Sequence, residues 1–216
     1  MNITNDLVTE YLNKFYEPLT PELLKLREAA EKDRIPVILR ETESFLKVFL
    51  RIVRPKKILE IGCAVGYSAM FFAEACGGKV FTIEKDRNMY DIAVENVKTL
   101  GYSDRVIPIS GDGREAFNLL SDESNVPFDL VFIDGAKSHY RAFFEACRVL
   151  CHKDTIIVSD NVLLKGRTAS DIYDPTGKYK TNIKNMREYT EFLCNDPKLE
   201  TTVIACGDGL AITRFM

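Results

Sequence analysis

The sequence predicts an α/β protein with a doubly wound, mostly parallel seven-stranded sheet, N-terminal helices and a C-terminal antiparallel hairpin. Two patterns predict this fold. From residue 57 to residue 160, short apolar runs alternate with amphipathic stretches, as in the strand–helix units of a parallel sheet covered on both faces. After them, TTVIAC (201–206) and LAITRF (210–215) flank Gly207-Asp208-Gly209, which is a hairpin signal.

The predicted helices of the N-terminal region come first along the chain. Thr20-Pro21-Glu22 predicts a helix start, because it combines a hydroxyl cap, a proline in the first turn and an acid near the positive end of the helix dipole. Ile35-Pro36 breaks the pattern, and apolar residues at helical spacing resume from Glu41 to Val53. The expected strands are 57–61, 79–84, 105–109, 128–134, 155–160, 201–206 and 210–215, and the helices between them are 67–76, 86–100, 112–120 and 138–150.

Composition limits the domain organisation and the class of protein. The 216 residues contain no internal repeat or Gly/Ser linker, so we expect one domain over 1–216, with a helical cap at 1–55 and the core at 56–216. A net charge of -3 excludes a histone-like binder whose whole surface neutralises phosphate. No apolar run approaches the ~18 residues of a membrane span, and the N-terminus lacks a signal-peptide layout. The six cysteines form no CxxC, so we expect free thiols in a cytoplasmic protein with no membrane partner.

A glycine-containing loop, GCAVGYS (62–68), joins the first predicted strand to its helix. Gly62 and Gly66, four positions apart, let the backbone turn tightly and approach a ligand closely. The spacing is not GxGxxG, so the dinucleotide fingerprint is not met. The next strand ends in Glu84, where an acid can accept both hydroxyls of a ribose. Loop and acid together indicate a nucleoside cofactor, and Asp112 could either reach an adenine edge or cap the helix that follows it.

A second group of polar residues follows two later strands. Asp134 ends one strand, and Asp160-Asn161 end the next. Three oxygen ligands at neighbouring strand ends, without His or Cys, suit a hard cation such as Mg²⁺ that keeps waters for substrate oxygens. Lys137 lies three residues beyond Asp134, close enough to face the same point. A lysine beside a metal ion and a cationic cofactor can serve as a general base.

These residues carry a resemblance to a known family. With EIGCAVGYS, Glu84, FDLVFIDGAKSHY and IIVSDN, the chain from about Ile35 to its C-terminus resembles the metal-dependent, S-adenosylmethionine (SAM)-using O-methyltransferases of the catechol and caffeoyl-CoA type. The resemblance implies a Rossmann-like class I methyltransferase domain and a homodimer. It implies a divalent cation, Mg²⁺ or another such as Mn²⁺, on Asp134, Asp160 and Asn161, with Lys137 as the catalytic base. The cofactor contacts that it implies are Val37, Glu60, Gly62, Gly66, Tyr67, Ser68, Glu84, Asp112 and Asp134.

The methyl acceptor is the least determined part of the prediction. Around IPVILRETESFL and SDNVLLKGR the sequence is most similar to bacterial enzymes of this family that methylate 5-hydroxyuridine at the tRNA wobble position to 5-methoxyuridine. A small-molecule catechol is the alternative, because both acceptors offer a hydroxyl beside a second oxygen. A binding protein or dehydrogenase that uses the loop without methyl transfer is a third hypothesis, against which the missing GxGxxG and the Asp/Asp-Asn set count.

The distribution of charge favours tRNA as the acceptor. Residues 25–57 hold ten Lys/Arg against five Asp/Glu, and residues 162–187 hold six against two. In a doubly wound sheet both segments could border one mouth, where an anticodon stem-loop needs positive charge and a small catechol does not. We therefore expect acceptor contacts from Arg40, Lys165 and Arg167.

Overall fold

A computed structural model describes residues 3, 5–120 and 127–216 of the chain. Within these residues a seven-stranded sheet has the order β3-β2-β1-β4-β5-β7-β6. The strands are β1 (Lys57–Ile61), β2 (Lys79–Glu84), β3 (Val106–Ser110), β4 (Phe128–Ile133), β5 (Cys151–Ser159), β6 (Leu199–Ile204) and β7 (Leu210–Phe215). The first five strands run parallel, and β7 is antiparallel to both β5 and β6. The predicted doubly wound sheet with its C-terminal hairpin is confirmed.

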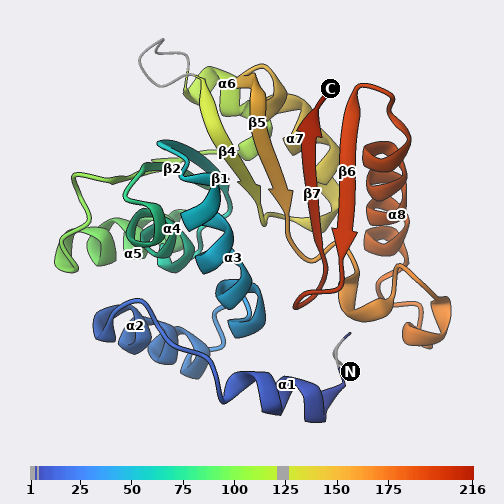
Figure 1. Ribbon diagram of the computed structural model, residues 1–216, viewed down its shortest axis with the longest axis horizontal. Coiled ribbons are helices and arrows are strands. Elements are labelled where there is room, and N and C mark those ends of the chain that lie inside the picture. The colour runs from blue at the N-terminus through green and yellow to red at the C-terminus, as the bar shows by residue number, and fades with distance from the viewer. Residues whose placement is uncertain (1–2, 4, 121–126) are drawn as a thin grey trace.

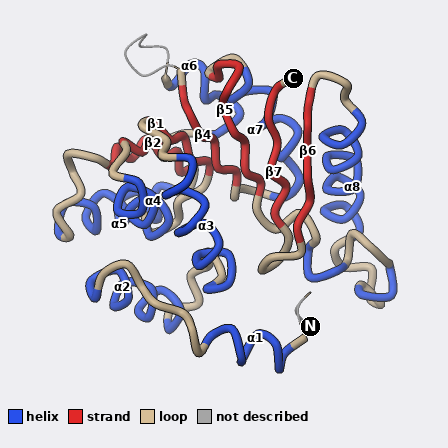
Figure 2. Tube along the Cα trace, viewed as in Figure 1, coloured by secondary structure: helices blue, strands red, loops and turns tan. Residues whose placement is uncertain are grey.

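Helices cover both faces of this sheet (Figures 1 and 2). The helices of the described residues are α1 (Asp6–Asn13), α2 (Pro21–Lys32), α3 (Arg40–Val53), α4 (Tyr67–Cys76), α5 (Arg87–Thr99), α6 (Ala116–Leu119), α7 (Tyr140–Arg148) and α8 (Lys180–Asn195). Of these, α1 contacts α3 and lies away from the sheet (Figure 1). The predicted start of α2 is confirmed, since the Thr20 hydroxyl accepts a hydrogen bond from Leu23 N at 3.1 Å and Pro21 occupies the first turn.

The core has two parts, one on each side of the sheet. Alternate side chains of a strand point to opposite faces, so Ile58 of β1 packs with α2, α3 and α4, whereas Leu59 packs with α6, α7 and α8. Helix α4 is buried nearly all round, because α2 and α3 cover the side that faces away from the sheet. The N-terminal helices α2 and α3 are therefore packed against the same core as the strand–helix units.

Several element boundaries differ from the prediction. The helix expected at 112–120 is a 3₁₀ turn (Gly113–Glu115) followed by the short α6, and the helix expected at 138–150 begins as a 3₁₀ turn and ends at Arg148. Strand β5 begins at Cys151 instead of 155, because the hydroxyl of Thr155 donates to the Phe128 carbonyl and a register shift in β4 lets Cys151 pair with Phe128. This extension was not predicted, because residues 152–154 are polar and the strands were predicted from apolar runs.

Helix α1 lies within the helical cap predicted over 1–55, although no range was assigned to it, and α8 was not predicted. Helix α8 buries Ile183, Met186, Tyr189 and Leu193, which recur at helical spacing and could have revealed it. Their signal was diluted by the charged residues between them. Helix α1 buries none of its residues, so nothing but its Asn5 cap and its amphipathic pattern marks it in the sequence.

Candidate active site

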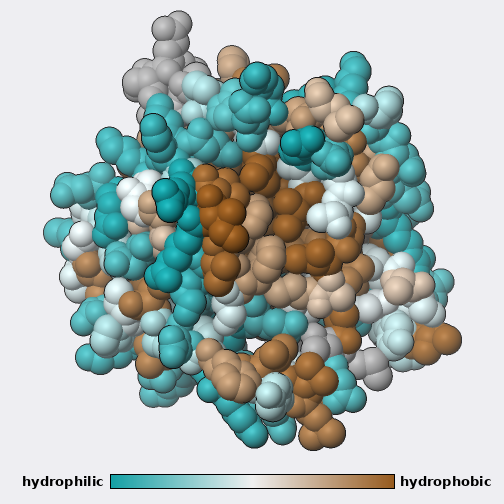
Figure 3. Space-filling model, in the orientation of Figure 1, coloured by the Kyte–Doolittle hydropathy of each residue, from teal (hydrophilic) through white to brown (hydrophobic). Residues whose placement is uncertain are grey.

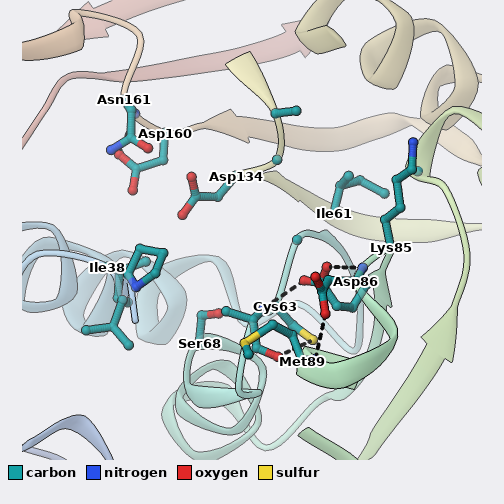
Figure 4. A pocket seen from close by; sticks show the side chains of 18 of the residues that line it. Ile38, Ile61, Cys63, Ser68, Lys85, Asp86, Met89, Asp134, Asp160 and Asn161 are labelled. Carbon is teal, nitrogen blue, oxygen red and sulfur yellow. Dashed lines mark hydrogen bonds between the residues drawn. The ribbon is translucent and has the colours of Figure 1, made fainter. Parts of the chain in front are cut away.

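A cavity of about 1140 Å³ lies at the carboxyl ends of the parallel strands, where ligands bind in doubly wound sheets. Segments from the loops after β1, β2, β3, β4 and β5 line it, together with residues 34–39 between α2 and α3. Figure 4 shows two groups of polar residues in it: Asp134, Asp160 and Asn161 lie together, apart from Lys85 and Asp86 at the end of β2.

The loop after β1 forms one part of the cavity wall. Gly62 donates its N–H to the Ile83 carbonyl at 2.8 Å and has a φ of +91°, which glycine adopts without strain. A Cβ built on Gly62 would lie 2.5 Å from the Asp134 carbonyl oxygen. Glycine at this position therefore lets the loop after β1 approach the loop after β4.

Glu84 is held at the cavity by backbone N–H groups. Its Oε2 accepts from Ala64 N at 2.9 Å and its Oε1 accepts from Asp86 N at 2.8 Å. These bonds tie the carboxylate to the glycine-containing loop and to the start of α5. The carboxylate is thus fixed at the strand end where a ribose binds in dinucleotide-binding folds.

Asp112 combines both of the roles considered for it. It caps the 3₁₀ turn by accepting from Arg114 N, and it also lines the cavity. The Arg114 guanidinium at 2.6 Å and the Lys85 ammonium at 2.9 Å neutralise its charge. Hydrogen bonds from Arg114 hold the pKa of this carboxyl well below its usual range, so Asp112 is ionised at neutral pH.

The other expected cofactor contacts divide into two groups. Val37, Tyr67 and Ser68 line the cavity, whereas Glu60 and Gly66 do not. Gly66 lies behind the loop, where it precedes α4 and faces Ala93. Glu60 is fully buried and accepts from the Thr82 hydroxyl at 2.5 Å, and burial raises the pKa of its carboxyl to about 8.

The expected metal ligands and the expected base meet at one point. Lys137 Nζ donates to Asp134 Oδ1 at 2.7 Å, to Asn161 Oδ1 at 2.5 Å and to the Tyr140 hydroxyl at 2.9 Å. Asp160 lies beside them, fully buried, and accepts from Asn161 N at 2.6 Å. Burial, and then the neighbouring Asp134 carboxylate, raise the pKa of Asp160. Asp134, Asp160 and Asn161 therefore bring their oxygen atoms together, and the charged form of the buried Asp160 carboxyl would be stabilised by a nearby cation.

This donor set fits a hard divalent cation. It has two carboxylates and one amide oxygen on rigid strand ends, the type of ligand that Mg²⁺ and Mn²⁺ take. Among the residues that the structure describes, no three His, Cys, Asp or Glu side chains are arranged so that they alone could hold a metal ion. The fit therefore depends on Asn161 acting as the third protein ligand.

Of the expected acceptor contacts, Lys165 lines the cavity and Arg40 and Arg167 do not. Arg40 lies at a second cavity of about 290 Å³ and pairs with Glu31 at 3.3 Å. The guanidinium of Arg167 stacks 4.3 Å from the centre of the Tyr179 ring. Both side chains are engaged by neighbours that are distant in sequence, which residue spacing does not reveal.

The two basic segments do border the same cavity, through Arg34 and Lys165. Several of their other cations are paired. Arg27 is buried against Glu43, and Arg187 pairs with Asp171 at 2.8 Å. The positive charge near the cavity is consequently smaller than the residue count indicates.

Two parts of the cavity wall were not predicted from the sequence. Residues 35–39 (Ile-Pro-Val-Ile-Leu) give it an apolar side, of which only Val37 was expected. Asp208, in the turn between β6 and β7, also lines it and accepts from the backbone N–H of Lys165. The apolar run around Pro36 and the Gly-Asp-Gly turn were visible in the sequence, but their distance from the strand ends along the chain concealed their place in the site.

Comparisons with known proteins identify the family. The profile of the O-methyltransferase family matches residues 16–216, so the chain belongs to this family. A caffeoyl-CoA O-methyltransferase of Populus kitakamiensis is 29% identical over 204 residues, covering 89% of this chain and 86% of the relative.

Solved structures agree with this assignment. A candidate caffeoyl-CoA O-methyltransferase from Staphylococcus aureus superposes with a TM-score of 0.89 at 31% identity, covering 97% of this chain and 100% of that chain. A Podospora anserina methyltransferase bound to S-adenosylhomocysteine (SAH) superposes with a TM-score of 0.86 at 26% identity, covering 98% and 94%. The chain is thus an enzyme of the O-methyltransferase family with the Rossmann-like fold of its structural neighbours.

Proposed function

We propose that this protein transfers the methyl group of SAM to one of two adjacent oxygens on a planar acceptor, with a divalent cation at Asp134, Asp160 and Asn161. The observation that carries the proposal is the convergence of Asp134, Asn161 and Lys137 Nζ within hydrogen-bonding distance. This cluster lies in the same cavity as Gly62 and Glu84, which fit a nucleoside. Cofactor and acceptor sites are thereby brought side by side.

The loop after β1 and Glu84 supply the cofactor site. Glu84 accepts hydrogen bonds from the ribose hydroxyls, because the N–H groups of Ala64 and Asp86 already orient its carboxylate. The N–H groups and small residues from Gly62 to Ser68 surround the methionine part, which the close approach of Gly62 to Asp134 brings next to the acceptor. An SAH-bound relative with the same fold supports this choice of cofactor.

Lys137 acts as the general base in the proposed mechanism. Asp134, Asp160 and Asn161 would hold a divalent cation, which would supply a Lewis acid that lowers the pKa of an acceptor hydroxyl. As the unprotonated amine, Lys137 Nζ takes the hydroxyl proton. The oxygen then forms a bond to the methyl carbon, and the carbon–sulfur bond breaks to leave SAH. Tyr140 keeps the Lys137 amine directed at the site through its hydroxyl. Holding the reactants at attack distance contributes up to roughly 7–11 kcal/mol.

For the acceptor we propose 5-hydroxyuridine in the anticodon loop of tRNA. Its hydroxyl and adjacent carbonyl offer the required pair of oxygens. Arg34 and Lys165, one from each basic segment, line the cavity, and their positive charge would attract the phosphates of an anticodon stem-loop. A small catechol has the same pair of oxygens, and the caffeoyl-CoA relative makes it the competing acceptor.

We further propose that residues 1–55 cap the core and that the protein is a cytoplasmic homodimer. Free thiols at all six cysteines support a reducing compartment, and no helix among the residues described is long and apolar enough to cross a membrane. An apolar surface runs across the face seen in Figure 3. It includes exposed or half-buried side chains of α3 and of the neighbouring strands, namely Phe45, Val48, Phe49, Ile52, Ile156, Ile204 and Ile212.

A second copy of this chain suits that surface. Helix α1, which packs on α3, also leaves its apolar side exposed, so the apolar surface extends to the N-terminal helix. Light scattering should give twice the monomer mass for the natural protein and the monomer mass for Ile52→Glu. The matched control Ile172→Glu, at another exposed isoleucine, should remain dimeric.

The central experiment measures methyl transfer from labelled SAM to hydroxyuridine-containing tRNA and to a catechol panel side by side, with Mg²⁺ and with excess chelator. We expect transfer to tRNA that falls steeply with added salt and stops with chelator. Transfer to catechols alone would replace the proposed acceptor, and undiminished turnover in chelator would refute the metal mechanism.

A further inference from the structure

Helices α2 and α3 bury an ion pair below the cavity. Arg27 of α2 is 1% exposed and Glu43 of α3 is 2% exposed, and the Arg27 guanidinium donates to the Glu43 carboxylate. The Arg27 guanidinium also lies 4.7 Å from the centre of the Tyr67 ring and donates to Glu31 at the helix surface at 3.1 Å. A fully buried arginine with this many partners is held in one orientation.

Both members of the pair contact residues that line the cavity. Arg27 Nε donates to the Tyr67 hydroxyl at 3.2 Å, and its terminal nitrogen donates to the Ile38 carbonyl at 2.7 Å. The Tyr67 hydroxyl in turn donates to Glu43 Oε2 at 2.7 Å. Tyr67 begins α4 directly after the glycine-containing loop, and Ile38 belongs to the apolar wall at 35–39. The ion pair thus joins two cavity walls that lie 29 positions apart in the sequence.

Packing alone does not require charges at this position. Leu23, Leu46 and Leu50 already bury α2 and α3 in the core, and apolar residues in place of a buried ion pair often preserve or increase stability. What apolar residues cannot do is donate to the Ile38 carbonyl and fix the Tyr67 hydroxyl in the same place. The buried charges therefore hold the Tyr67 hydroxyl and the Ile38 carbonyl at a fixed distance from each other.

We infer that Arg27, with Glu43, is a positioning residue for the cofactor site: it fixes Tyr67 and the wall at Ile38 around bound SAM. The inference rests on the proposed function. Arg27 lines the second, smaller cavity and does not line the main one, so it acts through Tyr67 and Ile38.

The test uses Arg27→Met combined with Glu43→Leu, which removes both charges and leaves neither unpaired. SAH affinity is measured by calorimetry, and the KM for SAM and kcat by initial rates. We expect the Kd for SAH and the KM to rise about tenfold while kcat at saturating SAM stays within about threefold. A purely structural pair would lower the folded fraction, and with it kcat, but would leave KM and Kd unchanged. An unchanged Kd in the folded variant would overturn the inference.

Two further variants complete the design. Leu23→Ala, on the same helix but away from the cavity, should lower Tm and leave the Kd for SAH unchanged. Arg27→Lys keeps the charge but cannot reach Glu43, Tyr67 and Ile38 together, so it should weaken SAH binding at least fivefold; equal binding would refute the role even if the double variant did not fold.

The pathway through Tyr67 is tested by adding Tyr67→Phe to the double variant. The two changes should not be additive, because both remove the same positioning contact; full additivity would show that Arg27 does not act through Tyr67. If the natural protein itself binds no SAH, the proposed function fails and the inference fails with it. If it binds SAH and the Arg27 variants bind equally well, only the positioning role fails.

Discussion

Replacing Gly62 by alanine should separate catalysis from stability. The new Cβ would lie 2.5 Å from the Asp134 carbonyl oxygen, about 0.9 Å inside the 3.4 Å at which ordinary contact begins. Both the φ of +91° and the backbone contact oppose the change. To relieve the clash, the loop after β1 and the loop after β4 must move apart by nearly 1 Å. This movement displaces Asp134, an expected metal ligand. A displacement of this size costs on the order of 10²-fold in rate, and the strained φ costs about 1–3 kcal/mol of stability.

A matched control isolates the contribution of the clash. Gly77 also has a positive φ, +72°, but a Cβ there meets no atom within 4 Å. Gly77→Ala should therefore lose stability of the same order and keep its activity. The assay is labelled methyl transfer at saturating SAM, with unfolding by urea measured in parallel. Equal specific activity of the two alanine variants would refute the claim that the Gly62 approach positions Asp134.

Three further results are expected. Lys137→Ala should lower kcat by about 10²–10⁴-fold, the usual contribution of a general base, and leave the calorimetric Kd for SAH within about threefold; loss of SAH binding would show that the base assignment is wrong. Asp134→Ala and Asp160→Ala should abolish metal-stimulated activity, whereas Asn161→Ala, which removes a neutral ligand, should retain activity at a higher Mg²⁺ concentration, as a Mg²⁺ titration of the rate would show. Burial raises the pKa of Glu60 from 4.5 to about 8. The folded state therefore binds the extra proton between these values, and the natural protein loses stability as pH rises through them. The Tm of Glu60→Gln relative to the natural protein should rise by about 8–15 °C from pH 5 to pH 8.5, and a constant difference would contradict the buried, protonated state.

The strand ends illustrate what periodicity can predict. Glu84, Asp134, Asp160 and Asn161 were assigned to one edge of the sheet because parallel strands present their carboxyl ends together, and the structure places all four at one cavity. Lys137 could be assigned to the same edge, because it follows Asp134 by less than one helical turn. Such local relations depend on the backbone geometry of a single strand–helix unit.

The acceptor side could not be predicted in this way. Arg40 and Lys165 had equal claims from charge, but Arg40 turns toward Glu31 and the second cavity, while Lys165 lines the first. The position of Arg40 depends on how α2 and α3 pack, and that of Lys165 on the contact of its backbone N–H with Asp208. No spacing in the sequence encodes either arrangement. The apolar wall at residues 35–39 became part of the site for the same reason.

By itself the sequence determined the alternation of strands and helices from residue 57 to residue 160, the polar residues at the strand ends and the family resemblance, because each depends on residues close together along the chain. Only the tertiary structure decided that Arg27 and Glu43 form a buried pair, that Tyr67 and Ile38 depend on it, and that Asp208 reaches the cavity. These contacts join positions between 11 and 43 residues apart in the sequence. Pairing at such separations depends on the packing and desolvation of the whole fold and not on the local sequence pattern.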